Sequence, residues 1–531
     1  MTMRFTSRWP AAVAVGLSLA TLVVVGCTGR TPPSASVPAK ADAVGSAATA
    51  AAKPMANWPD DLAGVLLISG DMLGYTEPCG CTKGQIGGLI RRTSLVDLLR
   101  TERKWPVALV DLGGLLNDPP SSHGGLDQTK IKFATILKAL TMLKYSALGL
   151  SAGDLKIGAD EALISILNNL PESPDAPKIV AANVTPAAGL GLESRFRKSV
   201  RIKLGTYDIG VTGVLDPKAF ADLKDASKAE MLTVASPDDV LPAVLADLEK
   251  DTTLQVLMVQ GPPELAKRLG LANPGFDVVV ATTPFGEPET TPATLHGGAT
   301  WLVTVGLKGQ YVGAIGLPKD KSKPRLYQRV VLKDRYDSYK TRAEAMRKLI
   351  DEDFVAELKS ADVVGRFQKD TYIHEGDPVA AEFVGAETCK SCHPNTYNVW
   401  AATKHAKAYE ALTSDPKRIR EADADCVRCH TTGFKYKSGF AGVEATPHLK
   451  GNQCENCHGP GSAHAAAPDD VAIRKVIARS REKIKDRCLD CHDEDNAPHG
   501  FEFDTMWAKV MHSKLDSYKD PAVHKGVVKK P

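Results

Sequence analysis

Four copies of one short motif, Cys-x-x-Cys-His, lie between residues 383 and 512 of this 531-residue chain. In such a motif the two thiols can form thioether bonds to the vinyl groups of a haem, and the adjacent histidine can supply an axial ligand to its iron. The sequence therefore predicts four covalently bound c-type haems. The residues are Cys389, Cys392 and His393; Cys426, Cys429 and His430; Cys454, Cys457 and His458; and Cys488, Cys491 and His492.

Paired Cys-x-x-Cys units also occur in zinc ribbons, where two pairs of thiolates hold one metal ion. A zinc ribbon needs no histidine after the second cysteine, but each of the four pairs here has one. Zinc ribbons are also mostly intracellular, whereas the N-terminus of this chain indicates export. Haem is therefore favoured over zinc.

The N-terminus carries Arg4 and Arg8, then an apolar run over residues 11–25, then Val24-Val25-Gly26-Cys27. The run is short for a membrane span and is typical of a signal peptide, here residues 1–26. Its end resembles a bacterial lipobox, which implies a lipid on Cys27. The alternative is plain secretion with an incidental cysteine.

Residues 27–60 are rich in Ala, Pro, Ser and Thr and predict a flexible tether. We expect a lipid-anchored protein on the periplasmic side of a bacterial membrane, inner or outer.

The charge balance excludes one class of partner. Sixty-six Lys and Arg residues face 63 Asp and Glu residues, a formal charge of +3. A chain of this length with so little net charge shows no sign of a nucleic-acid groove or a polybasic membrane patch. Redox proteins that dock on a local patch are the partners that we expect.

Eight of the eleven cysteines belong to the haem motifs and Cys27 to the signal, which leaves Cys79 and Cys81. These two lie one residue apart in a Gly- and Pro-containing loop. They are a candidate redox pair, because closely spaced thiols can form a strained, reducible disulfide or bind a soft metal. The alternative is an inert disulfide that staples the loop.

Residues 61–333 alternate aliphatic strands with helices and predict an α/β domain. The expected strands are 63–68, 107–112, 179–182, 255–259, 278–281, 301–305, 311–315 and 326–332, and the expected helices are 88–100, 130–143 and 237–249.

Four short stretches of this region follow one another in a distinctive order: Ser69-Gly70-Asp71-Met72-Leu73-Gly74, Gly87-Gly88-Leu89-Ile90-Arg91-Arg92, Ala147-Leu148-Gly149-Leu150 and Val305-Gly306-Leu307-Lys308-Gly309. In this order they resemble the metallophosphoesterase domain of the 5′-nucleotidase family, which implies a sandwich of sheets between helices. The loop around Cys79 and Cys81 resembles that of bacterial nucleotidase-like proteins with a Cys-Gly-Cys, some of them joined to multihaem cytochromes.

Most of the metal-ligand positions of that family hold other residues in this chain. Two-metal hydrolysis needs carboxylates and imidazoles that converge on two ions. Asp71 matches, but other ligand positions hold Leu73, Gly114, Ser151-Ala152, Gly261 and Thr282-Thr283-Pro284-Phe285. Asp71, Asp111 and Asp154 could still form a small metal site, or serve as caps and solvated loop residues. A metal-dependent phosphoesterase is therefore a third-ranked alternative.

Residues 334–378 are predicted to form a connecting helix and a linker that contains His374. Residues 379–531 are predicted to form a mainly α-helical, haem-packed domain. Its motifs, together with Trp400, the stretch His405-Ala406-Lys407-Ala408, the sequence Gly459-Pro460-Gly461 and the pair Met511-His512, resemble the cytochrome c-554 family of tetrahaem electron carriers.

That resemblance implies distal iron ligands at His405, His464 and His512, and an open, five-coordinate second haem at His430. His448 is a departure, because it could close the second haem. His374, His499 and His524 are expected to be solvated. The sequence favours an electron carrier over a hydrolase, with a reductase acting at an open haem or at Cys79 and Cys81 as the alternative.

Overall fold

The computed structural model describes residues 55–78, 84–116, 124–225, 228–283, 286–339, 343–367, 381–416, 419–493, 496–497 and 500–512. The predictions for the signal peptide, Cys27, most of the tether, Cys79 and Cys81, His374, His499 and His524 lie outside these ranges. Within them, no helix is long and apolar enough to cross a membrane.

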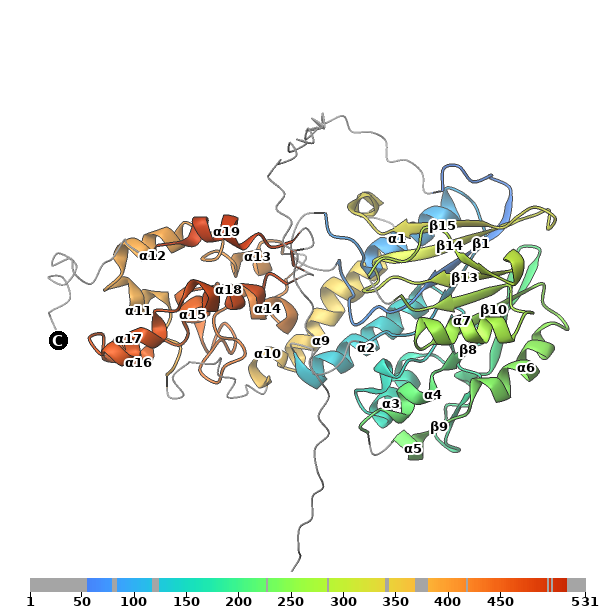
Figure 1. The fold of residues 1–531 in the computed structure, drawn as a ribbon, viewed down its shortest axis with the longest axis horizontal. Helices are drawn as coiled ribbons and strands as arrows, with labels where there is room; N and C mark the ends of the chain where they lie inside the picture. Colours follow the sequence, from blue (N-terminus) through green and yellow to red (C-terminus); the bar gives the residue numbers. More distant parts are fainter. Residues whose placement is uncertain are drawn as a thin grey trace, which may run out of the picture. The chain divides into compact units, whose positions relative to one another are not determined.

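The α/β domain, residues 55–333 as described, contains two large sheets (Figure 1). The first sheet has seven strands in the order β15-β14-β1-β2-β3-β4-β6, with β1 antiparallel to β14 and parallel to β2. Its strands are β1 (Leu62–Ser69), β2 (Val107–Asp111), β3 (Ala147–Leu148), β4 (Lys178–Val180), β6 (Phe196–Arg197), β14 (Tyr311–Pro318) and β15 (Leu326–Val331).

The second sheet has six strands in the order β12-β13-β11-β10-β8-β7. They are β7 (Ser199–Leu204), β8 (Tyr207–Leu215), β10 (Leu254–Gln260), β11 (Val278–Ala281), β12 (Ala293–Leu295) and β13 (Thr300–Thr304), and a small separate pair joins β5 (Val184–Pro186) and β9 (Leu232–Val234).

Apolar side chains of the two sheets pack face to face. Leu66 and Ile68 of β1 share one buried cluster with Val211 of β8 and Val256 of β10. The outer face of the first sheet packs against α1, α2 and α3, and that of the second against α6 and α7. The result is a sandwich of two sheets between helices, as predicted.

The helices of the domain are α1 (Leu89–Thr101), α2 (Gly125–Met142), α3 (Ala159–Asn169), α4 (Pro217–Ala221), α5 (Lys228–Met231), α6 (Pro237–Leu248) and α7 (Pro263–Ala272), with 3-10 turns η2 (Gly153–Leu155) and η3 (His296–Gly298).

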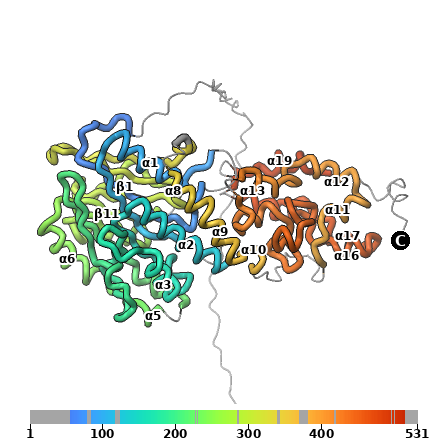
Figure 2. Tube along the Cα trace, turned by 180° about the vertical axis from the view of Figure 1, so that it is seen from behind, coloured from blue at the N-terminus to red at the C-terminus, as the bar shows by residue number. Residues whose placement is uncertain are grey.

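The connecting segment is less regular than the single helix predicted for residues 334–362. It contains a 3-10 turn η4 (Asp334–Tyr339), α8 (Glu344–Arg347), a π-helical turn η5 (Lys348–Asp353), α9 (Phe354–Ser360) and α10 (Val363–Arg366). Figure 2 shows α8, α9 and α10 following one another along the chain. Met346 and Ile350 belong to the core of the α/β domain, whereas Phe354 and Leu358 pack with the haem motifs. A change from one set of neighbours to another explains why the helical pattern is interrupted.

The regular structure of the haem segment, described residues 381–512, consists of short helices joined by turns, with an isolated bridge between Thr431 and Lys450, which agrees with the predicted mainly α-helical domain. Its helices are α11 (Ala386–Lys390), α12 (Pro394–Ala401), α13 (Glu410–Thr413), α14 (Ala424–His430), α15 (Cys454–His458), α16 (Ser462–Ala466), α17 (Val471–Ile477), α18 (Arg481–Leu489) and α19 (Phe503–Val510), with the 3-10 turn η6 (Pro447–Leu449).

Candidate haem sites

Each Cys-x-x-Cys-His motif begins in a short helix: α11, α14, α15 and α18 carry the first cysteine of the four motifs in turn. Residues three apart lie on the same face of a helix, so the two thiols of a motif face the same side. Asp423 caps α14 by accepting a hydrogen bond from Asp425 N, and Gln453 and Asn456 form a capping box on α15. These caps hold the motifs in helical form.

Three pairs of imidazole rings lie about as far apart as two axial ligands of one iron. The ring centroids of His393 and His464 are 6.3 Å apart, those of His405 and His492 are 6.2 Å apart, and those of His458 and His512 are 5.9 Å apart. Metal–nitrogen bonds of about 2 Å, with about 1 Å more from nitrogen to ring centre on each side, add up to ~6 Å. Each pair thus fits one iron atom between its two rings.

These pairs bring together residues that are far apart in the chain. His464 lies on α16 and faces the first motif, His512 follows α19 and faces the third, and His405 follows α12 and faces the fourth. All three histidines predicted as distal ligands therefore lie opposite a motif histidine. The sequence alone did not indicate which distal histidine belongs to which motif.

The chemical state of these histidines suits metal binding. Burial lowers the pKa of His405, His458, His464 and His492, which favours the neutral imidazole. The Nδ1 atom of His458 is 2.9 Å from the carbonyl oxygen of Ile477. When Nδ1 carries the proton and donates it there, Nε2 is left for a metal ion.

His430 of the second motif has a different environment. Its Nδ1 atom is 2.5 Å from the carbonyl oxygen of Ala408. Among the described residues, no histidine ring faces it. His448 is exposed, and its ring lies beside Gly385 near the first motif.

Cysteines of different motifs are neighbours. The thiol of Cys389 lies close to that of Cys454, and the thiol of Cys429 lies close to that of Cys491. These sulfurs stand where thioether sulfurs would be in a haem-loaded protein. The first motif is thus adjacent to the third, and the second to the fourth.

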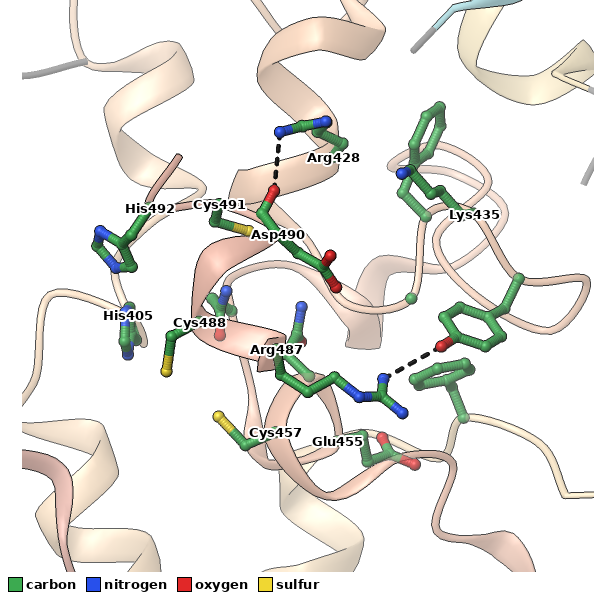
Figure 3. A pocket seen from close by; sticks show the side chains of 16 residues that line it. His405, Arg428, Lys435, Glu455, Cys457, Arg487, Cys488, Asp490, Cys491 and His492 are labelled. Carbon is green, nitrogen blue, oxygen red and sulfur yellow. Dashed lines mark hydrogen bonds between the residues drawn. The ribbon is translucent and has the colours of Figure 1, made fainter. Parts of the chain in front are cut away.

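Figure 3 shows a pocket lined by residues of the second, third and fourth motifs, with His405 and His492 on one side and Cys457, Cys488 and Cys491 around it. The imidazole pair of the fourth motif therefore lines this pocket. Arg428, inside the second motif, donates to the carbonyl oxygen of Asp490 at 2.7 Å and ties the second motif to the fourth. Our sequence analysis missed this arginine; its place between two motif cysteines was the available signal.

Comparison with known proteins agrees with this geometry. Residues 388–459 match the family model described as cytochrome c554 and c-prime. The chain is 31% identical over 196 residues to cytochrome c-554 of Nitrosomonas europaea, covering 83% of that protein and 28% of this chain. The chain belongs to the cytochrome c-554 family.

Cytochrome c-554 is not the only multihaem protein with a similar sequence. The chain is 28% identical over 151 residues to the multihaem cytochrome MtrA of Shewanella baltica, covering 44% of that protein and 25% of this chain. Family membership of the cytochrome c-554 type implies covalently bound c-type haem and electron transfer, and the motif residues described above fit that cofactor.

The chain is also similar to solved structures of 5′-nucleotidases. A 5′-nucleotidase precursor from Thermus thermophilus shares 16% identity with a TM-score of 0.45, covering 57% of this chain and 60% of that one. The NAD nucleotidase of Haemophilus influenzae shares 13% identity with a TM-score of 0.43, covering 63% of this chain and 68% of that one.

Asp71, Asp111 and Asp154, the three carboxyl groups considered for a metal site in the sequence, are buried, and other groups of the protein donate hydrogen bonds to them. Asp111 accepts hydrogen bonds from Ser69 Oγ at 2.6 Å and Gly113 N at 2.9 Å. Asp154 accepts from Ser151 Oγ at 2.8 Å and Leu116 N at 3.0 Å.

Asp71 accepts from Gln260 Nε2 at 3.3 Å, and its Oδ2 atom has no partner. Burial raises the pKa of Asp71 to about 7, against the effect of Gln260. Across the described part of the chain, no three His, Cys, Asp or Glu side chains form a group that could hold a metal ion. These residues do not fit a two-metal centre.

Proposed function

We propose that the protein is a tetrahaem c-type cytochrome that transfers electrons between redox proteins on the periplasmic side of a bacterial membrane. The observation that carries the proposal is the set of three imidazole pairs at ~6 Å, each with one member in a Cys-x-x-Cys-His motif. The pairs are His393 with His464, His492 with His405, and His458 with His512. The fourth haem in this proposal is held by His430.

The residues explain why such sites suit electron transfer. When bound, each haem supplies an iron that can gain or lose one electron. Two neutral imidazoles from separate parts of the chain would hold such an iron from both sides, so little would have to move when an electron arrives. Contacts between motifs, such as that of Cys429 with Cys491, keep neighbouring haems close.

Mass spectrometry of the purified protein, with pyridine haemochrome quantification, tests the haem count. We expect the mass of the mature chain plus four haems. A variant with serine in place of Cys488 and Cys491 should carry three. A wild-type mass with fewer than four haems under full haem supply would contradict the proposal.

We propose an open iron at His430 as a second function, a site where a small ligand or substrate is reduced. The absence of a facing histidine ring among the described residues favours it. The low-temperature electron paramagnetic resonance spectrum of the oxidised protein tests it. One high-spin ferric signal per protein is expected, whereas four low-spin signals would mean that another residue closes this iron.

The α/β domain enters this proposal without hydrolytic activity, because its buried carboxyl groups are engaged by the protein and do not form a metal site. Metal analysis after subtraction of haem iron, combined with a nucleotide hydrolysis assay, should find neither metal nor activity. Bound metal at a stoichiometric level, or hydrolysis of a nucleotide, would support the phosphoesterase alternative instead.

We propose a lipid on Cys27 as the membrane anchor, supported by the lipobox-like sequence before it. Fractionation of cells that express wild type or Cys27→Ser tests it. The wild type should be in the membrane fraction and the variant should not. An unchanged membrane fraction in Cys27→Ser would contradict lipid anchoring.

A further inference from the structure

The helix that carries the second haem motif, α14, is capped by a residue of the α/β domain. Gln128 on α2 donates from Nε2 to Asp423 Oδ1 at 2.8 Å and accepts from Ala424 N at 3.0 Å. Its side chain is fully buried. A Cβ atom on Gly124 would lie 2.3 Å from Gln128 Oε1, so only glycine leaves room for this arrangement.

Gln128 therefore satisfies two groups at once. The first N–H groups of a helix have no partner within the helix, and Ala424 N is one of them. The capping carboxylate of Asp423 also needs donors when it is buried. Gln128 supplies both an acceptor and a donor, and so fixes the start of α14 relative to α2.

One turn further along α2, Lys132 forms an ion pair with Asp425. Its side chain is 15% exposed, and that of Asp425 is 32% exposed. Partial burial makes such a pair stronger than one at the surface. Gln128 and Lys132 thus hold two successive positions of the first turn of α14.

A third contact lies just before α14. Arg420 is 5% exposed and pairs with Glu77 at 2.7 Å and with Asp351 at 2.6 Å. Its carbonyl oxygen accepts from Asp423 N at 3.1 Å. Glu77 belongs to the α/β domain and Asp351 to the connecting segment, so both extend the anchoring of this one helix.

Apolar packing surrounds the same place. Cys426 and Ile131 pack against one cluster that also contains Phe354, Val427 and Phe434. The α/β domain and the connecting segment therefore form part of the packed environment of the second motif.

We propose that Gln128 and Lys132 are positioning residues for the haem at Cys426, Cys429 and His430. The inference rests on the proposed attachment of a haem there. A haem iron with two imidazoles is held from both sides, but His430 has no facing imidazole among the described residues. Movement of α14 then acts directly on the bond between His430 and that iron, and the α/β domain sets the properties of this haem.

The test uses full-length, haem-loaded protein and the variants Gln128→Leu and Lys132→Met, after haem counting has shown that all four haems are present. A redox titration gives the midpoint potentials, and electron paramagnetic resonance gives the ligand field of each haem. We expect one potential to shift and one signal, the high-spin one, to change, while the other three haems are unaffected.

Two control variants separate positioning from general damage. Lys132→Arg keeps the ion pair and should restore the wild-type values. Lys138→Met removes a cation from the same helix whose partner is Glu357 at 2.8 Å, in the connecting segment, and should change no haem. Unchanged potentials in both Gln128→Leu and Lys132→Met, or equal shifts in all four haems, would overturn the proposal.

The wild-type spectrum separates this proposal from the open-haem function. Four low-spin signals in wild type would contradict the open iron. A midpoint potential that shifts at one haem alone in Gln128→Leu and Lys132→Met would still support positioning. If these variants leave both the high-spin signal and the midpoint potential of its haem unchanged, the result would support the open iron and contradict positioning.

Discussion

A distal histidine can be removed without touching the covalent attachment of its haem. His464→Ala is expected to leave His393 as the only imidazole on the first iron, because the two rings face each other at 6.3 Å. One low-spin signal should be replaced by a high-spin signal, visible by electron paramagnetic resonance, with all four haems still present by mass.

The matched control is His448→Ala, since His448 is exposed and faces no motif histidine among the described residues. Its spectrum should equal that of wild type. Loss of a low-spin signal in His448→Ala, or none in His464→Ala, would contradict the proposed ligand pairs.

Asp71 is expected to make the stability of the α/β domain depend on pH. Its pKa is about 7 in the folded protein and near 3.8 when unfolded. Between these values the folded state holds a proton that the unfolded state has lost, so the free energy of unfolding falls as pH rises from about 4 to 7 and stays low above 7. At ~1.4 kcal/mol per pKa unit, the loss is at most about 4 kcal/mol.

The variant Asp71→Asn should remove this loss, because an amide cannot ionise. Urea unfolding followed by circular dichroism should show the variant more stable than wild type at pH 8 and similar at about pH 4, where Asp71 is protonated in both states of the wild type. Asp216→Asn, at the N-cap of α4 where asparagine serves as well as aspartate, is the control. Equal pH dependence of the stability in wild type and Asp71→Asn would show that Asp71 is not the group responsible for it.

For single residues, the sequence predicted those haem-site positions that belong to short contiguous motifs. The haem attachment residues are contiguous motifs, and the three distal histidines lie in recognisable stretches. The pairing of His405 with His492 depends on tertiary packing across 87 residues, which periodicity does not encode. The role of Gln128 was equally hidden, because nothing in a glutamine on a predicted helix marks its partner.

Among the elements, α15 is fixed by one buried carboxylate. Glu455 is 2% exposed and accepts hydrogen bonds from Val384 N at 2.9 Å, Gly385 N at 2.8 Å and Gly461 N at 2.8 Å. It thus joins α15 to the start of α11 and to the loop before α16. Glu455→Ala would leave three buried N–H groups without that acceptor.

We expect Glu455→Ala to lower the free energy of unfolding of the haem segment by several kcal/mol, since each unsatisfied buried group costs about 1–3 kcal/mol. Denaturant unfolding followed in the Soret band measures it. Glu482→Ala on α18, at an exposed position, should have little effect. Equal stability of the two variants would show that the three N–H groups find other partners.

The sequence located the long central strands of the α/β domain and the helices α1, α2 and α6, because their aliphatic runs are continuous, but it missed α3, α7 and several short strands. It missed β7 and β8, a hairpin that turns at Gly205. Charged residues in Ser199–Leu204 and glycines in Tyr207–Leu215 interrupt the apolar pattern there. Pairing with β10 supplies the order that the pattern lacks.

For the molecule as a whole, Arg420 links three parts of the chain. It is held by Glu77 of the α/β domain and Asp351 of the connecting segment. Arg420→Met would leave two carboxylates, 17% and 12% exposed, without their cation. Breaking such a buried pair costs about 3–5 kcal/mol.

In wild type, the shift of the Soret band and the loss of sheet circular dichroism should occur at the same urea concentration, because contacts such as that of Arg420 with Glu77 join the haem segment to the α/β domain. In Arg420→Met the two transitions should separate. Lys348→Met, which removes a cation from an exposed pair with Asp353, should leave them together. Separate transitions in wild type would contradict this coupling.

The contacts between thiols of different motifs also bear on how the protein is made. A chain that folded before receiving its cofactors would bring Cys429 against Cys491 and Cys389 against Cys454. In an oxidising compartment such neighbours would crosslink two attachment motifs and block both. If the protein is exported as proposed, we therefore expect haem to be joined to the chain before the haem segment folds.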